Sequence, residues 1–269
     1  MQANDKNIQN IDKHSVLNLA VEMGRILLKN GAEIVRVEET IAHVCDHYQI
    51  NSVDCYILSN GIFVTAEEEG QQLFAKVKHI PLSSTHLGIV TAVNSLSREI
   101  ASGTISVEEA KMQLKSIEKM PSKRSYFRVL AAGVGSSCFC YTMGGNIWES
   151  LMAFLIAMTV YLVVLFSEKH NLSRIITNIL GGLSITVLAF GIVALQLPVT
   201  ILADKVIIGA IMPLIPGLAF VNAIRDIANS DFLSGTIRLI DSLLVFVYIA
   251  LGVGLGLSVY NNWIGGLLK

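Results

Sequence analysis

Apolar positions change along the chain from a spaced pattern in the first part to nearly continuous runs in the second. Up to about residue 122, hydrophobic residues recur at helical spacing or alternate as in strands. Beyond it lie five apolar segments, each near the ~20 residues that a helix needs to cross a bilayer. They are 126–145, 148–166, 174–195, 204–224 and 238–260. This pattern predicts an α-helical integral membrane bundle with five spans, preceded by a small α+β cytoplasmic domain.

The first part carries the short helical and strand patterns that predict the α+β domain. Val, Ile, Tyr, Phe and Thr gather around Asn60-Gly61, which is a strong β-hairpin signal. Gly31 predicts the end of the first helix, and Ser106 with Glu109 fits a capping box at the start of the last. The expected helices are 12–30, 34–49, 85–101 and 106–119, and the expected strands are 53–58, 62–66 and 72–80.

Charged residues are distributed unevenly, and this places the domain boundary. Of the 41 Lys, Arg, Asp and Glu residues, 26 lie in residues 1–122, although only 15% of the whole chain is charged and its mean hydropathy is +0.58. We therefore expect a cytoplasmic α+β domain at 1–122 and a transmembrane domain at 123–269. Residues 1–18 are polar and show no secretory signal. The net charge of −1 argues against a nucleic-acid partner.

Basic residues gather at alternate ends of the apolar segments, which predicts the orientation in the membrane. The ends at 144–146 and 196–198 carry none. By the positive-inside rule, the N-terminus is expected in the cytoplasm and, after five crossings, the C-terminus outside. Lys205 counts against this orientation, but the adjacent Asp204 weakens its effect. The basic residues on the expected cytoplasmic side are Lys123, Arg124, Arg128, Lys169, Arg174, Arg225 and Arg238.

The fourth apolar segment is interrupted at Pro216-Gly217. A proline removes a backbone donor and clashes with the preceding turn, and a glycine adds backbone freedom. In hydrocarbon the freed carbonyl groups need a protein or water partner, so such a break is tolerated only inside a bundle or at a cavity. Because anchoring does not call for a break, we expect Pro216 and Gly217 to form the gate or binding centre of a transport pathway.

Other features of the membrane segments concern helix packing and assembly. Gly181-Gly182 and the GxxxG spacing of Gly252 and Gly256 are expected to let helix backbones approach closely. The number of spans is odd, and no second copy of the Pro-Gly segment is found. This favours a partner subunit or a homo-oligomer.

Polar residues after the break admit two interpretations. Asn222 and Asp226 lie four apart on one helical face, with Arg225 alongside. They can form a helix end at the cytoplasmic interface, where Arg225 snorkels and pairs with Asp226, or an anion-coordinating cluster at the inner mouth of a pathway. Arg238 and Asp241 can likewise form a pair within one helix or supply counter-charge to the Arg225 cluster.

A second polar motif stands at the start of a helix in the N-terminal domain, with Gly31, Glu33, Arg36 and Glu38. Acidic residues are favoured there by the helix dipole, and Glu33 can pair with Arg36 three positions on. The simple interpretation is a capped, salt-bridged surface helix. A functional role is the alternative.

Several classes of chemistry have no support in the sequence. His43 and His47 have a metal-capable spacing but no third ligand, so no metal site is expected. There is no Walker loop, nucleotide fingerprint or nucleophile elbow, so no cofactor is predicted. A nucleophile–base set cannot be assembled from Ser83, Ser84 and His86 with Glu33, so the chain is not predicted to be an enzyme.

Taken in order, the motifs resemble those of the bacterial threonine/serine exporter family, over about residues 12–260. The likeness to its soluble domain rests on Gly31-Ala-Glu-x-x-Arg-Val-Glu-x-Thr40, Gly61-Ile-Phe-Val and Asn94. The likeness to its membrane portion rests on Met212-x-x-x-Pro216-Gly217, Asn222-x-x-Arg225-Asp226 and Ser234-Gly235-x-x-Arg238.

The resemblance implies the larger subunit of a two-component exporter, because single-chain members of the family have about ten spans and this chain offers five. The partner would be a small membrane protein that carries the remaining spans. Split pairs of this kind are also associated with export of succinate-like dicarboxylates.

We therefore expect a secondary transporter that exports small carboxylate-bearing metabolites across the cell membrane, with threonine and serine first and a dicarboxylate second. Arg225, with Asn222, would bind the substrate carboxylate, and Asp226 or Asp241 would serve as proton relay or counter-charge. The alternatives are a membrane-anchored hydrolase and a regulatory or scaffold subunit.

Overall fold

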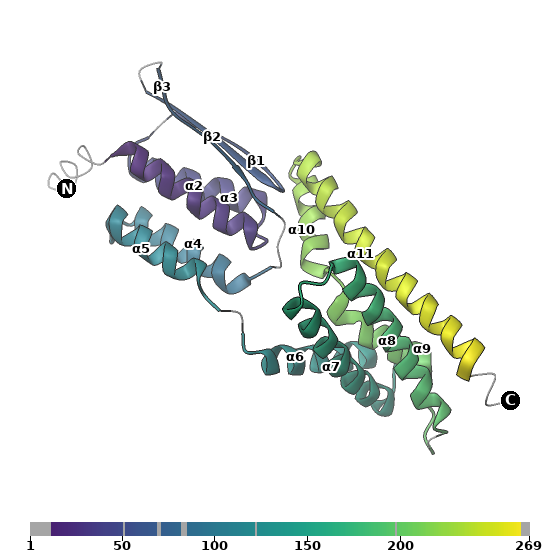
Figure 1. Ribbon diagram of the computed structural model, residues 1–269. Coiled ribbons are helices and arrows are strands. Elements are labelled where there is room, and N and C mark those ends of the chain that lie inside the picture. Colours follow the sequence, from purple (N-terminus) through teal and green to yellow (C-terminus); the bar gives the residue numbers. More distant parts are fainter. Residues whose placement is uncertain are drawn as a thin grey trace. The chain divides into compact units, whose positions relative to one another are not determined.

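The computed structural model describes residues 12–50, 52–68, 71–81, 85–121, 123–196 and 198–264, and these form two compact units (Figure 1). The first unit comprises the described residues of Met1–Ser122 together with Val221–Arg238. The second comprises the described residues of Lys123–Phe220 and Leu239–Lys269.

This division differs from the expected one in a single segment. Residues 221–238 group with the N-terminal residues, although the sequence assigns them to the membrane part. The segment contains the end of α10 (Gly217–Ala228), the turn that follows it and the start of α11 (Phe232–Val259). The physical reason is a set of polar contacts, described below, that ties this helical hairpin to the connection between α2 and α3.

The first unit has a helical layer and a small sheet, as the sequence predicts. Among the described residues the sheet has three antiparallel strands in the order β1-β2-β3, and Leu58 pairs with Gly61 across the expected hairpin turn. The capping box of Ser106 and Glu109 is also confirmed. The elements are α2 (Lys13–Lys29), α3 (Ile34–His47), β1 (Val53–Leu58), β2 (Gly61–Glu68), β3 (Gln71–His79), α4 (Leu87–Ala101) and α5 (Val107–Glu118).

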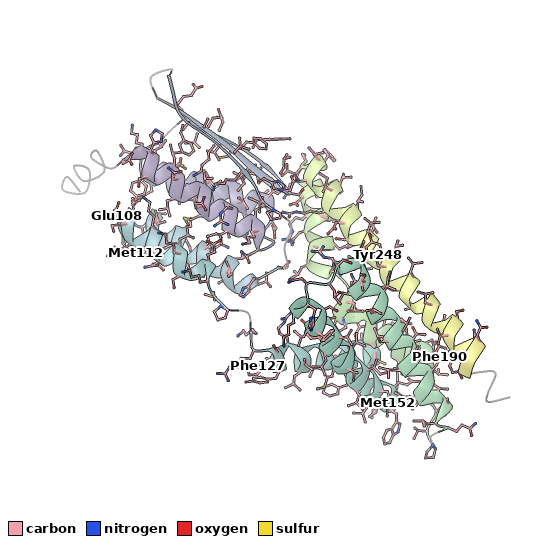
Figure 2. The ribbon with its side chains drawn as sticks, viewed as in Figure 1. Glu108, Met112, Phe127, Met152, Phe190 and Tyr248 are labelled. Carbon is pink, nitrogen blue, oxygen red and sulfur yellow. The ribbon has the colours of Figure 1, made fainter. Side chains whose placement is uncertain are left out.

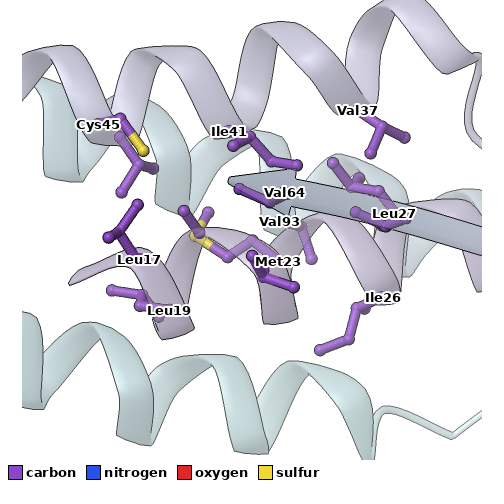
Figure 3. Close-up of a cluster of buried hydrophobic side chains, with 14 of the residues drawn as sticks. Leu17, Leu19, Met23, Ile26, Leu27, Val37, Ile41, Cys45, Val64 and Val93 are labelled. Carbon is purple, nitrogen blue, oxygen red and sulfur yellow. The ribbon is translucent and has the colours of Figure 1, made fainter. Parts of the chain in front are cut away.

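The core of the first unit is built around α2. Leu17, Met23 and Leu27 on this helix are fully buried and meet side chains from α3, β2 and α4, such as Val64 and Val93 (Figure 3). Burying each large apolar side chain contributes about 1.5–3 kcal/mol. The contacts come from elements far apart in the sequence, so this core holds the unit together.

The end of α2 is fixed by Gly31, as expected. Its φ of +83° lies in the left-handed region, which a side chain disfavours. A Cβ on Gly31 would also lie 2.6 Å from Thr85 Oγ1. The chain therefore turns sharply at this glycine and enters α3 three residues later, at Ile34.

The second unit is helical. Its elements are α6 (Ser125–Thr142), α7 (Ile147–Lys169), α8 (Arg174–Ala194), α9 (Ala203–Ile211), the short 3-10 helix η1 (Met212–Leu214), the start of α10, and α11 from Leu239 on, followed by the π-helical turn η2 (Tyr260–Ile264). Large apolar side chains such as Phe127 on α6 point outward and are exposed (Figure 2). A unit that exposes such side chains on its helices suits a lipid environment.

Within the described residues, three helices are long and apolar enough to cross a membrane, and a bent pair raises the number to four. The three are Ile147–Lys169, Arg174–Ala194 and Phe232–Asn262, and the bent pair is Ala203–Leu214 with Gly217–Ala228. The first expected span, 126–145, forms the 18-residue α6. With Arg128 near its start and several small and polar residues, α6 is not among these helices.

Close contacts between α8 and α11 depend on glycine, as the sequence predicts. A Cβ on Gly252 would overlap the carbonyl oxygen of Ile179, and one on Gly256 would lie 2.6 Å from Cβ of Thr186. Gly254, two residues from each, has nothing within 4 Å of the same position. Only one face of α11 therefore requires glycine.

We expect Gly252→Ala to lower the free energy of unfolding by about 1–3 kcal/mol, because the added methyl group must push the two backbones apart. Thermal unfolding in detergent would measure this loss. Gly254→Ala is the matched control on the same helix and should leave the unfolding temperature unchanged. Equal effects of the two substitutions would contradict the packing described here.

Candidate functional site

The break predicted at Pro216-Gly217 is present and bends the chain by 67° between η1 and α10. Ile215, which precedes the proline, has an extended backbone with ψ of 126°, as a residue before proline prefers. The carbonyl of Pro216 then accepts the first helical hydrogen bond of α10, from Phe220 N at 3.0 Å. Proline thus ends one helix, and its carbonyl begins the next.

Gly217 leaves open space at the break. A Cβ on this residue would meet nothing within 4 Å, so close packing does not explain the glycine. Broken helices expose backbone groups that can bind a solute or an ion, and the bend can act as a flexible point. The geometry is therefore compatible with the predicted gate or binding centre.

The second candidate site lies in the first unit, where the α2–α3 connection meets the α10–α11 hairpin. Its centre is an ion pair between Arg238 Nη1 and Asp226 Oδ2, 3.0 Å apart. Arg238 is 8% exposed and Asp226 1%, so both charges are buried. Arg238 also donates to the carbonyl oxygen of Ala32, with both Nη atoms at 3.3 Å.

Two further contacts join the same elements. Asn222 Nδ2 donates to the carbonyl oxygen of Gly31 at 3.1 Å. Arg225 Nη1 forms an ion pair with Glu33 Oε1. We call the whole set the loop–hairpin cluster, and its members are Gly31, Ala32, Glu33, Asn222, Arg225, Asp226 and Arg238.

The environment of Asp226 shows how the cluster carries its charge. In the described part of the chain, Oδ1 of Asp226 is buried and has no hydrogen-bond partner. The backbone amide of Ile34, at the start of α3, nevertheless attracts this carboxylate. Because the N-terminal end of a helix is partially positive, α3 adds to the stabilisation that Arg238 provides.

Next to the cluster, Glu38 on α3 lies near Asp231 in the turn between α10 and α11. Burial raises the pKa of Glu38, and the negative charge of Asp231 raises this pKa further. The hairpin is therefore attracted to α3 at Arg225 and Arg238 and repelled at Asp231. The balance between these contacts depends on the protonation of Glu38.

The structure brings together residues from both predicted motifs but changes their pairings. Asp226 pairs with Arg238 rather than with Arg225, and Arg225 pairs with Glu33. The expected pair of Glu33 and Arg36 is replaced in this way, and Arg36 is an exposed residue of α3. Local spacing suggested these pairs, but burial and the fold selected others.

Asp241 lies outside the loop–hairpin cluster. It belongs to the second unit and pairs with Arg174, with Nη1 and Oδ2 3.0 Å apart. The two side chains are 51% and 42% exposed. The prediction of an ion pair between Arg238 and Asp241 within α11 is therefore wrong. Arg238 instead supplies the counter-charge for Asp226.

The structure also shows polar residues that sequence reasoning missed. Glu149 at the start of α7 is buried and forms a capping box with Asn146, and its Oε1 accepts a hydrogen bond from Leu202 N at 2.8 Å. The Asn146-x-x-Glu149 spacing could have revealed it. The carbonyl of Ala32 carries no such signal, because a backbone group leaves no trace in the sequence.

Residues considered for enzymatic or metal chemistry are occupied otherwise or lie outside the described chain. His86 Nδ1 accepts a hydrogen bond from Ile89 N at the start of α4, and Glu33 is paired with Arg225. Ser83 and Ser84 lie outside the described residues. Within the described ranges, His43 and His47 meet no group that would complete a metal site.

An apolar helical unit with a proline-broken helix, joined to a polar α+β unit, is the architecture of an integral membrane protein. The family model described as "Putative threonine/serine exporter" matches residues 18–260. The chain therefore belongs to the threonine/serine exporter family, as its motifs predict.

Individual relatives support the same family. The chain is 26% identical over 249 residues to "Threonine/serine exporter" of Corynebacterium glutamicum, with 90% of this chain and 51% of that protein covered. It is 25% identical over 268 residues to "Probable succinate transporter subunit YjjP" of Escherichia coli, with 96% of this chain and 100% of that protein covered. The chain thus spans about half the length of the first relative and all of the second. No solved structure shows a significant match.

We expect Asp226→Asn to destabilise the protein by about 3–5 kcal/mol, because it leaves the buried Arg238 without its carboxylate. Asp241→Asn removes an equivalent but exposed partner of Arg174 and should cost about 1 kcal/mol or less. Thermal unfolding of the two variants in detergent compares them directly. A similar loss in both would mean that the Asp226 pair is not buried in solution.

Stability should also depend on pH through Glu38. Because its pKa is raised in the folded chain, its favourable contribution is complete at low pH and is lost as the pH rises above about 4.3, the ordinary value for glutamic acid. Glu38→Gln should therefore match the wild type at pH 4 and exceed its unfolding temperature at pH 7. Parallel curves for the two proteins between these pH values would contradict the raised pKa of Glu38, which burial and the charge of Asp231 cause together.

Proposed function

We propose that the chain is the larger subunit of a secondary exporter of small carboxylate-bearing metabolites, with threonine and serine as the first substrate class. The observation that carries this proposal is the 67° break at Pro216-Gly217 in a chain of the threonine/serine exporter family. Secondary transporters commonly use such broken helices to form a solute site within the membrane.

The proposed topology has five spans, a cytoplasmic N-terminal unit and an external C-terminus. Two ion pairs support it, because they join residues that this topology places near the cytoplasmic side. Arg128 near the start of α6 meets Glu168 at the end of α7, and Arg174 at the start of α8 meets Asp241. At the opposite helix ends, Lys205 donates to the Met143 carbonyl. In this topology α6 is the additional span.

A partner subunit completes the proposed transporter. The chain spans about half the length of the Corynebacterium glutamicum relative, and the Escherichia coli relative is named as a subunit. The partner would be a small membrane protein that supplies the remaining spans. A homo-oligomer, in which a second copy of the chain supplies the remaining spans, is the alternative.

Within this transporter, Pro216 and Gly217 would form the gate or binding centre, and Arg225 with Asn222 would receive the substrate carboxylate at the inner mouth. Arg225 suits this role because its side chain is 52% exposed and already holds a carboxylate, that of Glu33. Asp226, which is buried beside Arg238, would act as the counter-charge or proton relay. Asp241 is a weaker choice for that role, since it is exposed and pairs with Arg174.

A dicarboxylate such as succinate is the second candidate substrate. The observation that favours it is that the chain spans 100% of its second relative. The Escherichia coli relative named as a succinate transporter subunit agrees with this alternative.

Counterflow in proteoliposomes that contain both subunits tests the function and the role of Arg225. With threonine or succinate as substrate, Arg225→Ala should reduce the initial rate at least tenfold, because the substrate carboxylate loses its bidentate partner. Arg98→Ala on α4 is the control, since Arg98 is exposed and its side chain donates to Ser95 on the same helix. Wild-type counterflow in Arg225→Ala would refute the site, and no counterflow of either substrate by the wild type would refute the function.

A further inference from the structure

The contacts of the loop–hairpin cluster fall into a buried half and an exposed half. In the buried half, Arg238 binds Asp226 and the Ala32 carbonyl with little access to solvent. In the exposed half, Arg225 is 52% and Glu33 22% exposed. The buried contacts can hold the two elements together while the exposed ion pair opens and closes.

The exposed pair can be exchanged at low cost. Ion pairs in contact with solvent contribute little to stability, because water solvates both partners when they separate. The natural competitor of Glu33 for a guanidinium is another carboxylate of the same geometry. A substrate carboxylate that reaches Arg225 can therefore displace Glu33 without disturbing Arg238 and Asp226.

Displacement leaves Glu33 beside the bound substrate as a free negative charge. An amino acid carries an ammonium group next to its carboxylate, so the same pair can bind both charges of a zwitterion. A dicarboxylate carries a second negative charge instead, which Glu33 repels. The carboxylate of Glu33 therefore distinguishes the two substrate classes by charge.

We propose that Glu33 is a specificity-determining residue, which holds Arg225 in the empty site and, once displaced, accepts the ammonium group of an amino acid and repels dicarboxylates. This inference rests on the proposed function, since it requires that Arg225 binds the transported carboxylate. One side chain of the α2–α3 connection, that of Glu33, would then determine the selectivity between threonine and succinate.

The test compares L-threonine and succinate counterflow in proteoliposomes with both subunits. Glu33→Gln keeps the size of the side chain and removes its charge. It should lower the ratio of threonine to succinate rates by about fivefold, since the lost attraction of the ammonium group and the lost repulsion of the dicarboxylate are each worth up to about fivefold near solvent. Glu33→Asp retains the charge and should retain most of the wild-type ratio.

The outcomes separate this inference from the proposed function. An unchanged ratio in Glu33→Gln, or an equal fall in both rates, would overturn the specificity role even if Arg225→Ala abolishes counterflow. Wild-type counterflow in Arg225→Ala would instead overturn the carboxylate site and, with it, this inference. Detergent unfolding temperatures of both Glu33 variants verify that they fold, because the exposed pair contributes little to stability.

Discussion

The buried ion pair of Arg238 and Asp226 is the interaction on which the first unit depends beyond its apolar core. Removing two charges from water costs several kcal/mol for each, so such a pair persists only where other polar groups complete it. Here the Ala32 carbonyl serves Arg238, and the Ile34 amide attracts Asp226. These groups come from the α2–α3 connection, which the left-handed Gly31 turns toward α3. One electrostatic requirement therefore ties together residues that lie about two hundred positions apart in the chain.

The helix α10 carries residues of both candidate sites. The helix begins at the Pro216-Gly217 bend and carries Asn222, Arg225 and Asp226 over its following turns. In the proposed transporter, the polar unit would take part in transport directly, through the carbonyls of Gly31 and Ala32 and the carboxylate of Glu33, rather than serve as an attached accessory.

The sequence predicted the elements well, because their signals are local. Helical spacing, the Asn60-Gly61 turn, the Ser106 capping box and the Pro216 break each depend on a few neighbouring residues, and all four are present. The charged pairings were predicted less well. Arg225 and Asp226 are adjacent, and Arg238 and Asp241 are three positions apart. The fold instead pairs Asp226 with Arg238 in a buried site, and it places Arg225 and Asp241 in exposed ion pairs with residues that lie far away in sequence. The role of Ala32 could not be predicted, because its contribution is a backbone carbonyl.

The central claim is that the α2–α3 connection and the α10–α11 hairpin form one cooperative unit through the buried pair. Native-state hydrogen exchange of the full chain in detergent tests this most directly, because it reports the opening free energy of each segment. The account predicts that amides around residues 34–38 and 222–230 exchange with the same opening free energy, and that Asp226→Asn lowers both together. Different opening free energies, with only the hairpin affected by the substitution, would contradict it.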